Sequence, residues 1–600
     1  MFSQLPDHEK WQMAFSSAEF VAFAGQWIKV LPRSRQEALA IFVEQGIERL
    51  WPISFDYAFD PVFVRNEQLM ADCAGKTDAE LYRLWLTCGF VNGVAPNEQR
   101  YLEPYLAGAP FPMNFPWQDF VRRRRLPRST SRSAALAALF DSSSEQVVSA
   151  APLMGDDARW LLELIGRYKI GKDQMADAVA ILCLAVKLDP RPLSQGLLGD
   201  AYGSTGDTAK SLACYRAASA HPDVHHEIVA TCMRMLLDAG RFDDALIHLE
   251  TSHLHWRKFP AFTEWLQEAL VLKFEATCAQ ALKQYRRFDA AAVKAGVREA
   301  TDTIISEMLY DIADSFGKLD DLPGPVGPCA DGYVAILANM NIPQCVHYRV
   351  EQKAQQFALS GIPVRIFSEE DAGSFITSLA GARAAIFYRV AATPPVIRAI
   401  LHARTLGLDT WYEVDDLIFD PSAYPDPFES FGGQISEAEY AGLQMGVPLF
   451  RHALAMCDRA IASTPSLAKR MEALVRSGQC IVIRNGLDTR NDNAIRLSRH
   501  LPERRDGRVR LFYGSGTLAH NADFNNIAGP AITQAMARHD NVDLIVVGHL
   551  VLSPGIEAFS DRILQIPFMS DKDDYWSVLS SCDINIAVLA DGPVADCKSE

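Results

Sequence analysis

The chain has 600 residues, a formal net charge of −16 and 12 cysteines. This length predicts several domains of about 100–200 residues each, because a single hydrophobic core does not grow to that size. The acidic balance argues against a general nucleic-acid-binding protein. Without a signal-peptide pattern, an apolar run of membrane-spanning length or a Cys-x-x-Cys pair, the sequence predicts a cytoplasmic protein with free thiols.

Residues 1–125 are predicted to be helical, since segments such as AELYRLWLTCGFVNGV carry apolar residues at helical spacing. We interpret 126–157 as a basic linker and helix. The basic stretch RRRRLPRSTSRS, residues 122–133, is either a solvated linker or an electrostatic contact for anionic lipid headgroups. No chemistry is evident in this region.

An internal repeat occupies residues 158–255. Small residues recur at intervals of 33 and 34, at Ala178, Ser211 and Ala245. Each is followed four residues later by a larger apolar residue. The segment LLGDAYGSTGDTAKSLACYRAASAHPD resembles a tetratricopeptide repeat at Leu198, Gly199, Tyr202, Gly206, Tyr215 and Ala218. The resemblance implies stacked helix hairpins, which either bind a protein partner on a concave surface or only support the next domain.

Beyond the repeats the pattern changes from helical to α/β. Residues 256–318 read as a helical connector and 319–332, rich in Pro and Gly, as a linker. Apolar runs such as YVAILANM then alternate with helical segments, as in parallel sheets whose strands are buried on both faces. Two such series predict a Rossmann-like domain at 333–500 and a second one at 501–600.

The second series opens with a strand that runs into GSGTLA, residues 514–519. Glycines and small side chains at a strand end let a phosphate approach backbone N–H groups at a helix start. The segment fits the dinucleotide fingerprint, but the next strand ends in Gly548 and His549 rather than in the acidic residue that holds a ribose. No P-loop motif is present. We therefore expect a diphosphate-binding turn, with a tight turn that binds no ligand as the alternative.

Charged residues follow two other strands. ADGPVADCKSE ends the chain with Asp596, Lys598 and Glu600 after a strand, and YEVDDLIFD places Asp415 and Asp416 at another strand end. These edges are where doubly wound folds bind ligands. Asp571 and Asp573 match a D-x-D metal motif, but in a polar loop, so no metal is predicted.

Several short motifs in order resemble the bacterial group 1 (family 4) glycosyltransferases of the GT-B fold. They are AIASTPSLAKRM, VIRNGLDT, LFYGSGTLAHNADF and DINIAVLADGPVADCKSE, with YEVDDLIFD and VHYRVEQKAQQFALSGIPVRIF similar to the acceptor half. The resemblance covers about 330–600. It implies two Rossmann-like domains, a nucleotide-sugar donor that is a substrate and not a cofactor, and metal-independent transfer with retention. The family's Arg and Lys after the first strand are absent, because Ser515 occupies the Arg position.

The resemblance implies these site residues. Donor binding is expected from Gly514, Ser515, Gly516, Thr517, His520 and Asp596, catalysis from Lys598 and Glu600, and the acceptor side from Arg349, Asp415 and Asp416. The family's later pair of Glu residues falls near position 600, so we expect the donor domain to be truncated there. The implied setting is synthesis of bacterial surface polysaccharide or glycoconjugates, with at most peripheral contact at the inner face of the membrane.

The acceptor class stays open among glycans, lipid-linked intermediates and proteins, and the tetratricopeptide-like region would recruit a protein partner. Two other functions also stay open. One is a non-catalytic scaffold of tetratricopeptide and GT-B domains, which the missing cations favour. The other is a sugar-nucleotide epimerase of GT-B fold, which has no acceptor.

Overall fold

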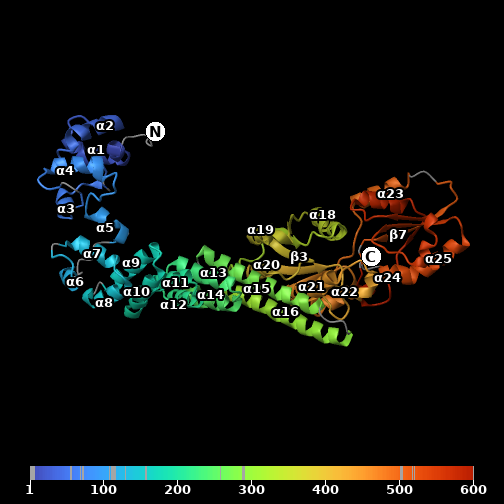
Figure 1. Cartoon of the computed structure of the whole chain (residues 1–600). Helices are drawn as coiled ribbons and strands as arrows, with labels where there is room; N and C mark the ends of the chain where they lie inside the picture. Colours follow the sequence, from blue (N-terminus) through green and yellow to red (C-terminus); the bar gives the residue numbers. More distant parts are fainter. Residues whose placement is uncertain are drawn as a thin grey trace. The chain divides into compact units, whose positions relative to one another are not determined.

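The computed structural model describes residues 7–54, 57–67, 69–70, 73–106, 109, 117–128, 130–155, 158–256, 259–286, 291–500, 504–516, 518 and 521–598. The chain divides into two compact units, Met1–Leu236 and Leu237–Glu600. Within the described residues the first unit is helical throughout, and the second unit carries two sheets whose strands alternate with helices (Figure 1). This confirms a helical N-terminal region followed by parallel α/β structure.

An aromatic core holds the first part of the first unit together. Phe20, Phe42, Tyr82 and Trp85 are fully buried there and pack ring against ring. Side-chain caps explain where several helices begin, as at α4, where Thr77 forms a reciprocal capping box with the third residue of the helix. The helices here are η2 (Asp7–Ala14), α1 (Ser17–Ala24), η3 (Gly25–Trp27), α2 (Arg35–Ile41), η4 (Phe42–Gly46), α3 (Pro61–Asn66), α4 (Asp78–Leu84), η6 (Trp85–Gly89) and α5 (Glu98–Leu106).

Part of the basic stretch 122–133 belongs to helices of this unit and makes contacts with it. Helix α6 (Trp117–Arg123) enters the stretch and α7 (Arg132–Phe140) begins near its end. Arg124 donates hydrogen bonds to Ser142 and to Gln146 beside α8 (Ser144–Ala150). The short turn η7 (Ala151–Leu153) follows. One arginine of the stretch therefore supports the fold instead of lying in a solvated linker.

Close helix pairs follow where the repeat is predicted. Side chains at Gly166 and Gly199 would collide with Leu182 and Tyr215, so these glycines set how closely α9 approaches α10 and α11 approaches α12. Gly206 lies in the left-handed region with φ +83°, which explains a glycine between α11 and α12. The assignment as tetratricopeptide repeats stays a prediction. The helices are α9 (Ala158–Gly171), α10 (Met175–Leu188), α11 (Pro192–Ser204), α12 (Thr208–Ser219) and α13 (His226–Asp238).

Long helices open the second unit. After α14 (Phe242–Trp256), α15 (Pro260–Arg286) and α16 (Ala291–Leu319) lie side by side (Figure 1). The predicted Pro/Gly linker then packs against the first sheet domain. Arg398 donates a hydrogen bond of 2.6 Å to the buried Asp320, and the amides of Val326 and Gly327 donate to the Leu406 carbonyl. The segment 319–332 is therefore held against the first sheet domain by hydrogen bonds at several positions.

Both sheets are parallel throughout. The first has the strand order β2-β1-β3-β4-β5-β6 and the second β10-β7-β8-β9. In β1 five of six residues are buried, as expected for a strand covered on both faces. The strands are β1 (Tyr333–Ala338), β2 (Val364–Ser368), β3 (Ala382–Tyr388), β4 (Asp409–Val414), β5 (Arg459–Ala462), β6 (Gln479–Val482), β7 (Val509–Ser515), β8 (Val542–Gly548), β9 (Ile563–Ile566) and β10 (Ile584–Ile586).

The strand orders define where ligands bind in such sheets. The chain reverses direction across the first sheet between β1 and β3, and across the second between β7 and β10. Parallel α/β sheets bind ligands outside the carboxyl ends of their strands at these reversal points. The intervening helices are α17 (Pro343–Val346), η9 (His347–Glu351), α18 (Gln352–Leu359), η10 (Glu369–Asp371), α19 (Ala372–Ser378), η11 (Leu379–Gly381), α20 (Pro394–Thr405), η12 (Phe428–Phe431), α21 (Glu437–Met456), α22 (Pro465–Glu472), α23 (Thr489–Ser498), α24 (Asn521–Asp523), η14 (Phe524–Ala528), α25 (Gly529–Arg538), α26 (Pro554–Glu557), η15 (Ser560–Arg562), α27 (Lys572–Ser580) and α28 (Pro593–Cys597).

Among the described helices, none combines the length and the apolar character needed to span a bilayer. All the cysteines lie in described segments and carry free thiols.

Candidate functional site

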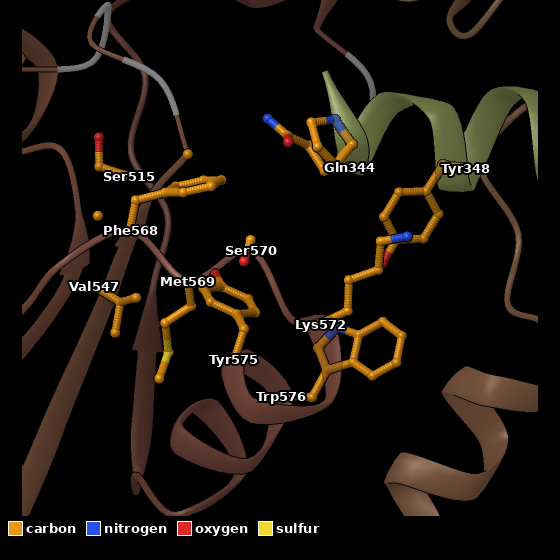
Figure 2. A pocket seen from close by; sticks show the side chains of 13 residues that line it. Gln344, Tyr348, Ser515, Val547, Phe568, Met569, Ser570, Lys572, Tyr575 and Trp576 are labelled. Atoms are coloured by element: carbon orange, nitrogen blue, oxygen red, sulfur yellow. The ribbon is translucent and has the colours of Figure 1, made fainter. Parts of the chain in front are cut away.

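A cavity of about 310 Å³ lies at the carboxyl edge of the second sheet. Helix α17 and turn η9, which follow β1, form one wall of it, and residues from β7, β8 and α27 form the other (Figure 2). The two reversal points therefore contribute to the same cavity. Its lining residues are Pro343, Gln344, Tyr348, Ser515, Gly516, Val547, Gly548, Phe568, Met569, Ser570, Lys572, Tyr575 and Trp576.

The glycine-rich turn predicted to bind a diphosphate reaches this cavity. Ser515 and Gly516 line it, and Gly514 lies one residue deeper against the Tyr575 hydroxyl, where a side chain would collide with it. Gly548, with φ +105°, leaves room for the Ser515 carbonyl of the neighbouring strand. Close packing around the strand ends thus explains Gly514 and Gly548. A Cβ added at Gly516 would only come into van der Waals contact with Gln344, at 3.6 Å.

A cation enters the same cavity from an element that the sequence analysis did not select. Lys572 begins α27, which Asp571 caps by accepting from two backbone N–H groups. Figure 2 shows the Lys572 side chain beside Tyr348 and Trp576. Its Nζ lies 3.9 Å from Glu351. Lys572 therefore brings a positive charge to the same cavity that Ser515 and Gly516 line.

An ion-paired cluster occupies the carboxyl edge of the first sheet. Arg389 follows β3, and its Nη1 lies 3.2 Å from Asp415 and 2.9 Å from Asp416. Lys598 donates a hydrogen bond of 2.8 Å to the other oxygen of Asp416. The Tyr388 hydroxyl donates to Asp415 at 3.2 Å. The side chains of Arg389 and Lys598 thus neutralise two carboxylates at the carboxyl edge of the first sheet.

The electrostatics of this cluster favour its charged state. Burial alone would raise the pKa of Asp416, but Lys598 and Arg389 hold that pKa well below its usual value. Burial alone would lower the pKa of Lys598, and the Asp416 carboxylate instead raises it. Arg389 also has φ +50°, a backbone conformation that costs a non-glycine residue about 1–3 kcal/mol. Such strain persists only where the surroundings hold the residue, and it is found at functional sites.

Helix α17 links the cavity to the cluster. Gln344 lines the cavity, while the next residue, Cys345, lies against the cluster. Burial, reinforced by the Asp415 carboxylate, raises the pKa of Cys345 to about 12. The two groups of polar residues are therefore neighbours across a single helical turn.

The structure separates the predicted site residues into several places. It brings Asp415, Asp416 and Lys598 together and puts Ser515 and Gly516 in the cavity. Lys598 follows α28, whose Cys597 carbonyl accepts a hydrogen bond from Thr464, so it lies against the first sheet domain instead of lining the cavity. Asp596 is exposed on α28 and does not line the cavity either. Thr517, His520 and Glu600 lie outside the described residues.

The prediction that Arg349 lines the acceptor side needs correction. Its side chain is buried, with the residue 2% exposed, and its Nη2 lies 2.6 Å from the fully buried Glu413. Nη1 donates to the Ile483 carbonyl and to Asn485 in the segment after β6. The resemblance implied an acceptor-side position for Arg349, and it did not show that the side chain points into the interior.

The sequence analysis missed the cavity residues that come from other elements. Arg389 directly follows β3 at the first reversal point, so the reversal-point rule would have indicated it for the ion-paired cluster. Lys572 follows β9, an edge strand, and the rule does not indicate it. Gln344 carries no such signal, because only the packing of the two sheet domains brings it to the cavity (Figure 2). Tyr575 comes from α27, in the same sheet domain as the glycine turn.

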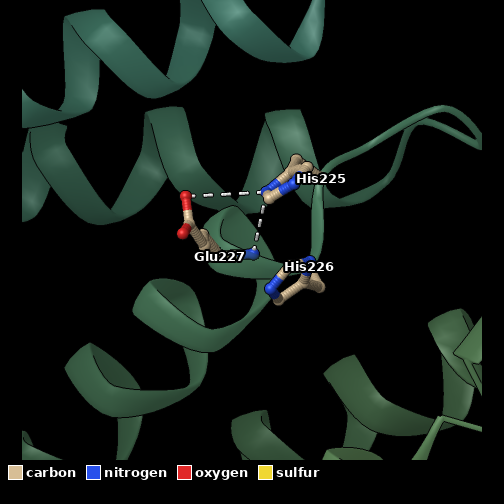
Figure 3. A group of neighbouring side chains, drawn as sticks. All are labelled: His225, His226 and Glu227. Carbon is tan, nitrogen blue, oxygen red and sulfur yellow. Dashed lines mark hydrogen bonds and ion pairs between the residues drawn. The ribbon is translucent and has the colours of Figure 1, made fainter. Parts of the chain in front are cut away.

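One cluster of metal-ligand type occurs in the described residues, at His225, His226 and Glu227 before and at the start of α13 (Figure 3). Its ligand atoms lie within 4.8 Å of one another. The three residues are consecutive, His225 and Glu227 are exposed, and His225 Nδ1 accepts from the Glu227 amide at 3.5 Å. These are properties of a polar surface turn, and we assign no metal to it.

No protein-family model and no curated protein matches this chain. Among solved structures, it is similar to a mutant of Thermobaculum terrenum O-GlcNAc transferase, at 11% identity and TM-score 0.21 over 77% of this chain and 79% of that one. It is also similar to full-length LpoA from Haemophilus influenzae, at 11% identity and TM-score 0.16 over 72% and 79% of the two chains. Scores this low carry no argument about fold or activity.

Proposed function

We propose that the second unit is a glycosyltransferase that takes a sugar from a nucleotide-sugar donor. The observation that supports this proposal is the cavity at the carboxyl edge of the second sheet, which combines a glycine turn, hydroxyl groups and Lys572. A nucleotide sugar needs a place for a diphosphate, hydroxyl-binding groups and aromatic surface for its rings. Ser570, Tyr348 and Trp576 supply the last two beside the turn.

In this proposal the donor diphosphate lies against the backbone of Gly514–Gly516 and the Ser515 hydroxyl, with Thr517 and His520 adjoining in the chain. Lys572 stabilises the negative charge that grows on the departing diphosphate, which is the main catalytic contribution expected here. Lys598 does not line the cavity and is paired with Asp416, so this proposal assigns it to the acceptor side and not to the departing diphosphate. Transfer with retention and without a metal belongs to the same proposal.

The acceptor is proposed to approach from the Arg389 cluster. Asp415 and Asp416 lie at the strand edge next to α17, so a hydroxyl acceptor bound there would be close to the donor cavity. The acceptor class is a glycan, a lipid-linked intermediate or a protein. The helical first unit is proposed to recruit a protein partner.

The direct experiment is a thermal-shift and hydrolysis screen with UDP-, GDP-, dTDP- and ADP-sugars, with NAD as a negative control. Stabilisation by one nucleotide series together with sugar release is the expected result. Gly516→Val is expected to abolish both, because the added side chain projects toward the cavity near Gln344. Gly373→Val on α19 is the matched control, since an added Cβ there meets nothing within 4 Å.

Lys572→Gln tests the electrostatic role. Loss of a charge-assisted contact to phosphate is expected to weaken donor binding by about 1.5–3 kcal/mol, which is roughly ten- to 150-fold. Lys318→Gln removes an exposed lysine whose Nζ lies 2.6 Å from Asp314, and it should leave binding unchanged. Equal donor binding by both variants would contradict the role of Lys572.

A non-catalytic scaffold is the second candidate, and one observation favours it. Lys598, the lysine that the sequence analysis gave a catalytic role, is already paired with Asp416. Donor binding without sugar release or transfer would support the scaffold, and release of a sugar with altered stereochemistry would support the epimerase.

A further inference from the structure

An exposed aromatic and aliphatic face lies on the first unit, remote in function from the proposed donor site. We call it the Phe23–Leu31 face. Phe23 is 38% exposed, Trp27 50%, Val30 72% and Leu31 55%. Four large apolar side chains within nine residues of sequence are more than the single exposed hydrophobics that are normal on a protein surface.

The face is built on a rigid support. Helix α1 buries Phe20 and Ala24 in the aromatic core and turns Phe23 outward. The Phe23 and Trp27 rings lie 5.8 Å apart, and Trp27 stacks on the buried Trp51 at 6.2 Å. The exposed side chains are therefore held in place by the core.

The segment around this face carries more cations than carboxylates. Lys29, Arg33 and Arg35 are all exposed, while Glu19 and Glu37 flank the segment and the Glu37 carboxylate accepts a hydrogen bond of 2.6 Å from the Arg33 backbone amide. Arg49 adds a cation behind the face, over the Trp51 ring at 5.3 Å. A locally basic segment is notable in a protein whose net charge is −16.

We propose that the Phe23–Leu31 face docks on an anionic lipid bilayer. Tryptophan and phenylalanine prefer the interface between headgroups and acyl chains, and neighbouring Lys and Arg bind anionic headgroups. The exposed Lys29 and Arg33 beside the apolar centre supply charge that is complementary to such a surface. In this proposal the protein binds at the membrane surface, because only side chains insert into the bilayer. The proposal does not depend on the proposed glycosyltransferase activity.

The test is cosedimentation of the full chain with vesicles at about 0.1 M salt. One vesicle type contains equal parts of phosphatidylglycerol and phosphatidylcholine, and the other contains phosphatidylcholine alone. We expect binding to the anionic vesicles and a strong reduction in 0.5 M salt, because salt screens the charges. Lys29→Gln and Arg33→Gln should each lower the partition coefficient about fivefold. Trp27→Ser should lower it about tenfold or more.

Matched controls separate the face from general stickiness. Val62→Ser removes another exposed apolar side chain of the first unit, and Lys187→Gln removes an exposed lysine on α10. Both should bind vesicles like the parent protein. Unchanged circular dichroism and thermal unfolding of Trp27→Ser establishes that its fold is intact.

Three results would overturn the proposal. They are the absence of binding to the anionic vesicles, equal loss of binding in the control variants, and retained binding in Trp27→Ser and in the charge variants. Self-association that Trp27→Ser abolishes, without vesicle binding, would instead identify the face as an interface between copies of this chain.

Discussion

Replacing Arg349 with methionine is expected to destabilise the first sheet domain without acting on ligand binding directly. Arg349 and Lys353 both pair with Glu413, which is fully buried, at 2.6 and 3.1 Å. The substitution removes one cation and also the hydrogen bonds to Ile483 and Asn485. Breaking a buried ion pair from one side costs about 3–5 kcal/mol.

The lower end of that range is expected because Lys353 remains. Burial lowers the pKa of Lys353, and Arg349 lowers it further, so removal of Arg349 lets Lys353 hold its proton more firmly beside Glu413. Each tenfold change in an equilibrium constant corresponds to about 1.4 kcal/mol. A loss of about 3 kcal/mol in the free energy of unfolding therefore makes amide hydrogens exchange roughly 100-fold faster wherever this domain opens as a unit.

Hydrogen–deuterium exchange of the full chain measures this directly. Peptides that cover β4 and the segment after β6 should exchange faster in Arg349→Met, and peptides of the first unit should not. Arg459→Met is the matched control, because Arg459 is partly exposed over the Trp411 ring of the same sheet and should contribute less than about 1 kcal/mol. Parent-like exchange in Arg349→Met, with loss of acceptor binding alone, would refute this reasoning and restore the acceptor role.

Three further results are expected. The pKa of Asp416 is depressed, so its contribution to stability is complete above the ordinary carboxyl pKa and is lost as the pH falls below that value. Asp416→Asn should therefore flatten the acid limb of a curve of stability against pH. An unchanged acid limb would contradict the pairing of Asp416 with Lys598. Gly514→Ala should lower the free energy of unfolding by about 1–3 kcal/mol, because the added methyl group pushes the Tyr575 hydroxyl away. Adding Tyr575→Phe should restore part of that stability. A double variant that is as unstable as Gly514→Ala alone would place the strain elsewhere. The pKa of the half-buried Cys345 thiol is raised to about 12, so it should resist iodoacetamide at pH 8 while the exposed thiols react, as peptide mass spectrometry can measure. Labelling of Cys345 at the rate of the exposed thiols would contradict the raised pKa.

Much of the architecture followed from local pattern. The run YVAILANM predicted a strand buried on both faces and became β1, and the alternation of apolar runs with helical segments predicted two parallel series. Gly206, which matches the tetratricopeptide consensus, lies between α11 and α12 with a positive φ. These features depend on residues that are close together in the chain, so a short stretch of sequence is enough to predict them.

The candidate site was predicted only in part, because it combines residues far apart in sequence. Ser515 and Gly516 reach the cavity as expected, yet Gln344 and Lys572 meet them there from segments more than fifty residues away on either side. Whether a charged residue faces solvent or the interior is also invisible to local pattern, as Arg349 shows.

Residue types and their spacing therefore determine the helical and α/β halves, the order of strands along the chain and the glycine turn at the end of β7. Only the tertiary structure decides that Arg349 is buried on Glu413, that Lys598 pairs with Asp416, and that Lys572 lines the same cavity as Ser515 and Gly516. The physical reason is that burial and charge pairing depend on which surfaces meet after the sheets have packed, and no short stretch of sequence contains that information.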